Sequence, residues 1–436
     1  MKLLLVVLSL LLGAAQCSGE GCGGYPSNDP CLPGGVWDTV LKRCTGIDSQ
    51  PCYQCYSGDY CKTKEDPLQC KLASVGGNPV YLSEYWTGGH STEAEPCTQT
   101  PGHYRPAYQG NHYSTKVEEN IFPPLKEAIL QLHKLTGNAE TEGYFMVTGM
   151  GATMVIHSAL AVISKRILQE CSSSLEVCPT AVDVFAQAPY YPGYIFISSN
   201  CPNTRWNASA DPNSPFTIEI LTYPDNPSGV KRNPLVMDPS RVVMDMVYYW
   251  PMYTEINAKL DHPLMVFSSS KHGGLAGTRF GWGLVKDKDL AVGMLQVVDG
   301  IMLDFSIDVQ LRVLNGLQVV LEEANKTQTH NFPFHEFGHE VISSRFKGVS
   351  DLFSSCPGLS LTNQLSSTGG YAWIMCSAGI MANGSCEQVL ERVNLYGIEG
   401  SVFGAMDNYV RLSMLLPTVE FDTLFLKLKY LCSMLG

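Results

Sequence analysis

From about residue 72 to residue 325, short apolar runs of strand length alternate with segments that carry a helical pattern. The strand-like runs are residues 181–186, 241–244, 265–267 and 281–285, and the clearest helical patterns are residues 125–135 and 309–323. Such alternation is typical of α/β domains, in which helices cover a mostly parallel sheet. We therefore expect a large α/β domain over residues 72–327 and a smaller α+β domain over residues 328–436.

The composition suits a chain with more than one hydrophobic core, since 45% of its 436 residues are hydrophobic and 16% are charged. Its formal net charge is −12, and it contains no basic run interleaved with aromatic residues. Nucleic acid is therefore not an expected partner, and an anionic membrane surface would repel the chain.

Residues 1–17 have the pattern of a secretory signal peptide, with a positive start, a short apolar core and small residues near the end. The apolar stretch is shorter than a membrane span needs, and we expect no later segment to reach that length. These features predict a secreted protein, or one in the lumen of the secretory or vacuolar pathway, without stable membrane insertion.

Seven cysteines lie between Cys22 and Cys70, in a stretch rich in turn residues. A segment that cannot bury its own core needs covalent links, so residues 20–71 are expected to form a small disulfide-rich module. Cys52 and Cys55 have the spacing of a zinc clip or redox pair, but an exported, cysteine-dense segment favours disulfides.

Two further features fit an oxidising compartment. Cys171 and Cys178 close a short serine-rich loop, which predicts a disulfide. Asn207, Asn325 and Asn383 each begin an N-glycosylation sequon. No partner is assigned to Cys201, Cys356 or Cys432.

Residues 268–282 place Lys271 among small residues, with Arg279 eight positions later. A lysine can form a Schiff base with pyridoxal phosphate only when its amine has lost a proton, and a nearby arginine favours that loss and binds the phosphate. Taken alone, such a glycine-rich segment is more often an ordinary loop.

Asp245 directly follows the apolar run at 241–244, which delivers it to the carboxyl edge of the expected sheet, where ligands bind. There its carboxylate could pair with a protonated pyridine nitrogen, so that the ring accepts electrons from a substrate carbon. Tyr248 and Asn226 could hydrogen-bond the ring's phenolate oxygen. The alternative for Asn226, which precedes a proline, is an ordinary surface turn.

Residues 142–153 have the pattern of a strand, a glycine turn and the start of a helix. Gly151, Ala152 and Thr153 would present backbone N–H groups to an anion such as a phosphate. Tyr191 follows another expected strand and could stack on a planar ring. Each segment alone could be a plain connection, but their order along the chain indicates one cofactor site.

In these segments the chain resembles the alliinase and tryptophan-aminotransferase-related group of fold type I pyridoxal phosphate enzymes. The resemblance covers residues 52–411. Its most specific segments are residues 245–253, 271–282, 371–376 and 409–413.

The resemblance implies a homodimeric enzyme with shared active sites, pyridoxal phosphate as cofactor and an amino acid as substrate. The implied cofactor residues are Lys271 for the Schiff base, Asp245 for the pyridine nitrogen, Asn226 and Tyr248 for the phenolate oxygen, Tyr191 for stacking, and Arg279, Gly151, Ala152 and Thr153 for the phosphate. Arg411 is implied to bind the substrate α-carboxylate through its planar guanidinium.

Segments nearer the N-terminus also resemble this family. Tyr108 corresponds to a tyrosine that reaches the phosphate of the neighbouring subunit. Gly76 and Gly77 fall in a segment that lines the substrate pocket, although Gly76 stands where alliinases carry serine.

Cysteine positions extend the resemblance. Cys52 and Cys61 lie in a stretch similar to the end of an EGF-like module and are expected in disulfides. Cys376 and Cys386 match a bridge of the family.

Residues 335–339 spell the zinc-binding pattern His-Glu-x-x-His. Pro333 and Gly338 weaken the expectation of a helix there, and the extended metzincin pattern is absent because Ile342 and Arg345 replace its glycine and histidine. No metal site is therefore expected.

The exported architecture with an EGF-like module looks more like alliinases than like their relatives without such a module, and this resemblance implies a carbon–sulfur lyase that cleaves S-substituted cysteine or its sulfoxide to a sulfenic acid or thiol, pyruvate and ammonia. An aminotransferase of an aromatic or other L-amino acid would use the same core residues and is the main alternative. A secreted binding protein without catalytic activity is the third.

Overall fold

The computed structural model describes residues 121–436, apart from 175–176, 303–304, 328–332, 382–383 and 417, together with four short strands nearer the N-terminus. These strands are β1 (Val36–Asp38), β2 (Arg43–Thr45), β3 (Tyr56–Ser57) and β4 (Thr63–Lys64), which pair β1 with β2 and β3 with β4. The predictions for the signal peptide, Cys52, Cys61, Gly76, Gly77, Tyr108 and Asn383 lie outside the described residues.

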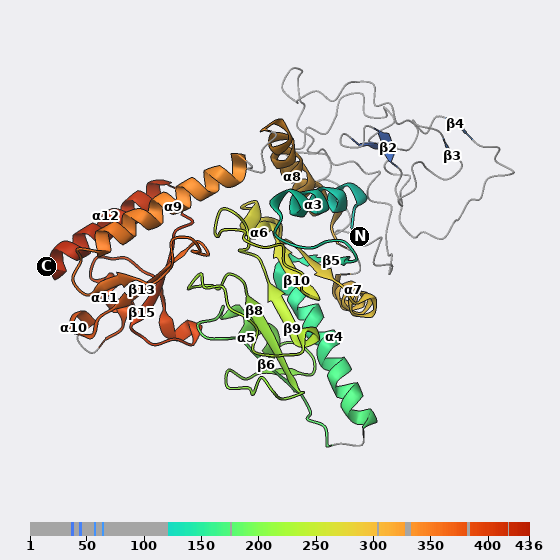
Figure 1. Cartoon of the computed structure of the whole chain (residues 1–436), viewed down its shortest axis with the longest axis horizontal. Coiled ribbons are helices and arrows are strands. Elements are labelled where there is room, and N and C mark those ends of the chain that lie inside the picture. Colours follow the sequence, from blue (N-terminus) through green and yellow to red (C-terminus); the bar gives the residue numbers. More distant parts are fainter. Residues whose placement is uncertain are drawn as a thin grey trace, which may run out of the picture.

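The larger sheet has seven strands in the order β5-β11-β10-β9-β8-β6-β7 (Figure 1). Their bounds are β5 (Phe145–Met150), β6 (Val182–Phe185), β7 (Thr204–Trp206), β8 (Thr217–Thr222), β9 (Val242–Asp245), β10 (Leu264–Ser268) and β11 (Phe280–Val285). Only β11 runs antiparallel to its neighbours. The four strands β8 to β11 are buried along their whole length, which explains why their sequences are mostly small and apolar, with Glu219 and Asp245 as the charged exceptions.

Helices cover both faces of this sheet (Figure 1). They are α3 (Pro123–Thr136), α4 (Gly151–Ser173), α5 (Gly193–Ser199), the short α6 (Ser269–His272), α7 (Lys288–Met302) and α8 (Ile307–Thr327). Apolar residues of α3 and α8, such as Leu125 and Leu317, share one hydrophobic cluster with Phe267 of the sheet. Those of α4 and α7, such as Ala159 and Met294, form a second cluster on the opposite face. The expected α/β fold is therefore confirmed.

Helix α4 has enough length and apolar composition to span a membrane, which corrects the expectation that no segment after residue 17 does. Its buried side chains, including Val155, Ala159 and Ile163, instead pack against the sheet and its covering helices. A helix that is apolar on most sides is also what the centre of a large domain requires.

The C-terminal part contains a four-stranded antiparallel sheet in the order β12-β13-β15-β14. The strands are β12 (Leu359–Leu361), β13 (Tyr371–Cys376), β14 (Ile398–Glu399) and β15 (Tyr409–Ser413). Its helices are α9 (Pro333–Phe353), α10 (Ala378–Met381), α11 (Cys386–Glu391) and α12 (Thr418–Leu435). In Figure 1, α9 and α12 run side by side along this sheet, with Phe346 and Leu428 in their common core. The division of the chain near residue 327 stays a prediction.

Helix α9 includes the zinc-like pattern that sequence reasoning had not expected to be helical. Pro333 is tolerated because it stands in the first turn, where its missing N–H has no partner to lose. His335 is buried against His272 with 2.9 Å between their Nε2 atoms, whereas His339 lies near Ser343 on the exposed side. Among the described residues, no group of three metal-ligating side chains is found.

Three disulfides occur in the described part of the chain. Cys171 bonds to Cys178 and Cys376 to Cys386, as the sequence analysis expected. The third joins Cys356 to Cys432 and ties the loop after α9 to α12. Cys201 is a buried thiol.

Two of the sequon asparagines are described. Asn207 is half-buried and donates through Nδ2 to Asp183, while Asn325 is exposed on α8. Glycosylation at either position stays a prediction.

Candidate active site

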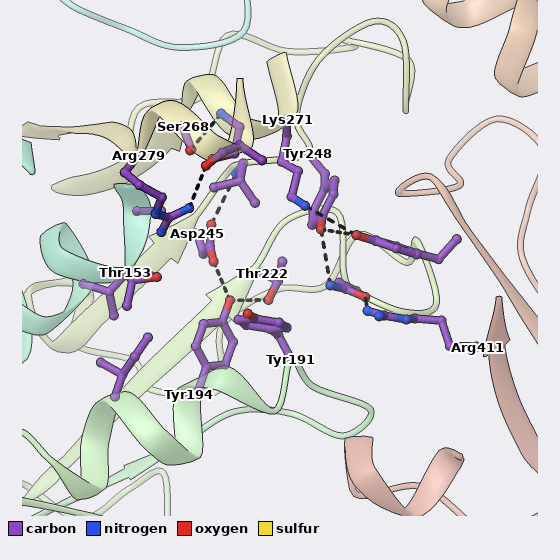
Figure 2. Close-up of a pocket in the computed structure, with 18 residues that line it drawn as sticks. Thr153, Tyr191, Tyr194, Thr222, Asp245, Tyr248, Ser268, Lys271, Arg279 and Arg411 are labelled. Carbon is purple, nitrogen blue, oxygen red and sulfur yellow. Dashed lines mark hydrogen bonds between the residues drawn. The ribbon is translucent and has the colours of Figure 1, made fainter. Parts of the chain in front are cut away.

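A cavity of roughly 300 Å³ lies where the carboxyl ends of β8, β9 and β10 face the smaller sheet (Figure 2). This is the ligand-binding edge of an open α/β sheet. Its lining includes nine of the predicted site residues: Ala152, Thr153, Tyr191, Asn226, Asp245, Tyr248, Lys271, Arg279 and Arg411. Gly151 directly precedes this lining at the start of α4.

One end of the cavity is built to receive an anion. Gly151 begins α4 with a φ of +72°, and no side chain caps the helix, so its first N–H groups have no side-chain acceptor. A Cβ at Gly151 would lie 2.7 Å from Nη2 of Arg279, and one at Gly281 would overlap the backbone of Gly151 and Ala152. The two glycines thus let a guanidinium, a strand and a helix N-terminus meet, which concentrates positive potential at one point.

Arg279 reaches this point from a tight turn after the 3₁₀ helix η4 (Ala276–Thr278). Its backbone has a φ of +57°, which is uncommon for a residue with a side chain. Its Nη1 donates to the carbonyl of Ala276 at 3.2 Å, and the side chain is exposed. The guanidinium therefore keeps further N–H donors for a ligand.

Asp245 is buried deeper in the cavity, at the end of β9. Its Oδ2 accepts a hydrogen bond from Oη of Tyr194 at 2.6 Å, and its Oδ1 accepts one from the N–H of Val247 at 3.3 Å. Oγ1 of Thr222 lies 2.6 Å from the same tyrosine oxygen. Since an ionised carboxylate only accepts, Tyr194 donates to Asp245, and its oxygen accepts a hydrogen bond from Oγ1 of Thr222 (Figure 2).

The pKa of Asp245 reflects a balance between burial and these hydrogen bonds. Burial raises the pKa of the Asp245 carboxyl, and the Tyr194 hydrogen bond, the Val247 N–H and the charge of Lys271 offset part of that rise. The resulting pKa is about 6. The carboxylate is therefore mostly ionised at neutral pH, where it can pair with a cationic ligand group.

A chain of polar contacts connects Lys271 to Arg411. Nζ of Lys271 donates to Oη of Tyr371 at 3.5 Å, and that oxygen lies 3.0 Å from Oη of Tyr248. Asn226 donates through Nδ2 to Tyr248 at 3.3 Å and accepts at Oδ1 from Nη1 of Arg411 at 2.9 Å. The larger sheet's loops thus contact the smaller sheet through hydrogen-bonding side chains.

Arg411 enters the cavity from β15 and is half-buried. Its guanidinium carbon lies 4.2 Å from the ring centre of Tyr371 and 4.9 Å from that of Phe403. Aromatic faces on a guanidinium hold its plane without using its N–H groups, which leaves them available to a carboxylate.

Tyr191 forms the outer wall of the cavity and is 39% exposed. Its ring stands edge-on to Tyr194, with 5.4 Å between the ring centres. Gly193 makes this placement possible, because a Cβ there would overlap the Tyr191 ring.

Tyr194, Thr222 and Tyr371 also line the cavity, although the sequence alone indicated no role for them. Thr222 ends β8 shortly before Asn226, and Tyr194 lies three residues after Tyr191. Tyr371 opens a segment that carried the family resemblance. Their nearness to the motifs can be read from the sequence, but their hydrogen bonds depend on strands that are distant in the sequence and adjacent in the fold.

The chain is similar to a known family of enzymes over most of its length. The family model described as allinase matches residues 73–432. Tryptophan aminotransferase-related protein 3 of Arabidopsis thaliana is 28% identical over 400 residues, which cover 87% of this chain and 82% of that protein. Alliin lyase 1 of Allium sativum is 28% identical over 404 residues, covering 87% of this chain and 78% of the lyase.

Solved structures resemble the fold at lower identity. Thermus thermophilus aspartate aminotransferase has a TM-score of 0.54 at 16% identity and covers 71% of this chain and 86% of its own. An Escherichia coli protein with a methionine aminotransferase function has a TM-score of 0.55 at 14% identity and covers 82% and 90%. The chain therefore has the fold of the fold type I pyridoxal phosphate enzymes.

Proposed function

We propose that this chain, which belongs to the allinase family of pyridoxal phosphate-dependent enzymes, is a carbon–sulfur lyase. Its substrate would be an S-substituted cysteine or its sulfoxide, and its products a sulfenic acid or thiol, pyruvate and ammonia. The observation that carries the catalytic part is the single cavity that holds Lys271, the buried Asp245 and Arg411. Similarity to alliin lyases and the cysteine-rich N-terminal sequence support the choice of lyase.

The described residues fit the cofactor at both of its ends. Gly151 and Gly281 form a cradle in which the start of α4 and Arg279 come close together, so that the N–H groups of both would donate to one phosphate. At the other end, Asp245 is a buried carboxylate that would pair with the pyridine nitrogen, while Tyr248 and Asn226 would hydrogen-bond the phenolate oxygen. When bound, the cofactor supplies an acceptor for the electrons released at the substrate Cα.

Asp245 would keep a proton on the pyridine nitrogen. It can do so only when ionised, and the hydrogen bond from Tyr194 favours that form. Val247 fixes the second oxygen, so the carboxylate keeps one orientation towards the cavity.

Lys271 would hold the cofactor and then act as the base that accepts the Cα proton of the amino acid. It stands in the short helix α6 directly after β10, and Ser268 caps that helix by accepting from the N–H of Ser270. Tyr253 donates from Oη to the Lys271 carbonyl at 2.8 Å. These contacts fix the lysine backbone while its amine stays in the cavity.

Arg411 would bind the substrate α-carboxylate in a bidentate manner. In an Arg411→Ala variant we expect the dissociation constant for amino acids to rise at least tenfold, because each charge-assisted hydrogen bond contributes about 1.5 to 3 kcal/mol. Cofactor content should stay at the parent level, and absorbance titration measures both. Loss of the cofactor itself would contradict this role.

The alternative is an aminotransferase, which the similarity to tryptophan aminotransferase-related proteins favours. Both activities would need the same lysine, carboxylate and guanidinium, so the described cavity does not separate them. We also propose a homodimer, in which Tyr108 would reach the cofactor phosphate of the neighbouring subunit, and residence in the secretory pathway, which the three described disulfides support.

Pyruvate release distinguishes the two activities. The purified protein is incubated with S-alkyl cysteines and their sulfoxides without any added keto acid. A lyase forms pyruvate continuously, with ammonia in equal amount. Product formation that requires an added keto acid would contradict the lyase and establish the aminotransferase.

A further inference from the structure

Among the hydrogen-bonded residues between Lys271 and Arg411, Tyr371 is the one that contacts both the Lys271 amine and the Arg411 guanidinium. It begins β13, and only 7% of its surface is exposed. Its hydroxyl lies 3.0 Å from Oη of Tyr248 and accepts from Nζ of Lys271 at 3.5 Å. Its ring lies 4.2 Å from the guanidinium carbon of Arg411.

The strand register explains why the same side chain meets Arg411. In the pairing of β13 with β15, Trp373 stands opposite Arg411 and Tyr371 opposite Ser413. Residues two apart along a strand point to the same face, so Tyr371 and Arg411 project together from the smaller sheet. Both belong to this sheet, whereas Lys271 lies in α6 and Tyr248 in the turn after β9.

A buried hydroxyl needs only one partner, and Tyr248 already supplies it. The additional approach of the Lys271 amine and the stacking of Arg411 are therefore not required for burying Tyr371. They place one rigid ring between the two groups for which we propose chemistry, the base at Lys271 and the carboxylate anchor at Arg411.

We infer that Tyr371 is a positioning residue that orients the Lys271 amine through its hydroxyl and the Arg411 guanidinium through its ring. This inference rests on the roles proposed for Lys271 and Arg411 and adds a residue to them. The hydroxyl accepts an N–H of the lysine nitrogen, which directs that nitrogen towards the substrate carbon. The ring face keeps the guanidinium plane turned to the carboxylate of the same substrate.

Two substitutions separate the two contacts. Tyr371→Phe removes the hydroxyl and keeps the ring under Arg411, and Tyr371→Leu removes both. Tyr409→Phe is the matched control, because Tyr409 lies in the neighbouring strand β15, stacks on Trp373 at 5.0 Å and does not line the cavity.

Three readouts on the holoenzyme test the inference. The first is the rate at which a bound amino acid exchanges its Cα hydrogen with deuterium from the solvent. The second is the dissociation constant of an α-methyl amino acid, which carries the carboxylate but has no Cα hydrogen to lose. The third is the pH midpoint at which the visible absorption of the lysine-bound cofactor changes.

We expect Tyr371→Phe to slow exchange by roughly 10- to 100-fold, since a misplaced catalytic group costs up to that factor. It should lower the pH midpoint by about one unit, because one hydrogen bond to a cationic nitrogen is lost, and leave α-methyl amino acid binding within about twofold. Tyr371→Leu should also raise that dissociation constant by roughly tenfold. Tyr409→Phe should match the parent in all three.

The inference is overturned if Tyr371→Phe exchanges at the parent rate with an unchanged pH midpoint, or if Tyr371→Leu binds the α-methyl amino acid as tightly as Tyr371→Phe does. Failure of the proposed function looks different, because the parent protein itself would then show no bound cofactor or no exchange.

Discussion

At the scale of single residues, the site depends on keeping Asp245 charged in a buried position. Burial raises the pKa of this carboxyl, and the hydroxyl of Tyr194, itself held by Thr222, works against that rise. A charged acceptor gains more from such a hydrogen bond than a neutral one does. Tyr194 would therefore act on the cofactor through the charge of Asp245.

Removing this hydroxyl should make cofactor binding depend on pH. In Tyr194→Phe we expect the pKa of Asp245 to rise further above about 6, by one to two units, because a hydrogen bond to a charged group is worth about 1.5 to 3 kcal/mol. The protonated carboxyl cannot pair with a pyridinium, so cofactor affinity should fall roughly tenfold near pH 6.5 and little near pH 8.5. Cofactor titration at the two pH values measures this.

Tyr223→Phe serves as the control, because Tyr223 packs on Tyr249 and does not line the cavity. An equal loss of affinity at both pH values in Tyr194→Phe would mean that the hydroxyl does not act through the charge of Asp245.

At the scale of elements, the anion-binding end results from the close approach of α4, β5 and β11. The strand, glycine turn and helix at 142–153 were predictable, because the change from strand-like to helical pattern is local in sequence. The approach of Arg279 to Gly151 was implied only by the family resemblance, because it depends on the antiparallel pairing of β11 with β5. The helical conformation of residues 333–340 was not expected for another reason. Proline disrupts the interior of a helix but is tolerated in its first turn, and Pro333 is the first residue of α9.

Gly151→Ala tests the close approach. The new Cβ would lie 2.7 Å from the Arg279 guanidinium and would also strain a backbone with a φ of +72°. We expect cofactor affinity to fall at least tenfold and the free energy of unfolding to fall by about 1 kcal/mol or more. Equilibrium titration and urea unfolding measure the two effects.

Gly143→Ala is the matched control, because Gly143 has a φ of +78° and nothing within 4 Å of the added Cβ. It should lose stability through the backbone alone and bind cofactor as the parent does. Equal cofactor affinity in the two variants would rule out the proposed phosphate cradle.

At the scale of the whole molecule, the site forms where two sheets meet. Strand β9 of the larger sheet and helix α6, which follows β10, supply Asp245 and Lys271, and the smaller sheet supplies Tyr371 and Arg411. The chain order of the motifs predicted the first pair, whereas Tyr371 could not be assigned because its partners lie 100 or more residues away. A cross-link that stays unassigned in the sequence, the Cys356–Cys432 disulfide, joins the loop after α9 to α12 beside the smaller sheet.

Replacing both Cys356 and Cys432 by serine should lower the free energy of unfolding, because their bond closes a loop with a sequence separation of 76 residues. The comparison is a double serine variant at Cys171 and Cys178, whose separation is 7. Loop entropy predicts that the first variant loses about 2 kcal/mol more than the second. Denaturant unfolding measures the difference, and an equal or smaller loss in the first variant would contradict the account from loop entropy.

The central claim is that Lys271 holds pyridoxal phosphate in the cavity between the two sheets. Reduction of the purified protein with borohydride, followed by proteolysis and mass spectrometry, tests it directly. We expect the reduced cofactor on the peptide that contains Lys271, and no modified peptide from a Lys271→Ala variant. Cofactor attached to a different lysine, or a parent protein that carries none, would contradict the account.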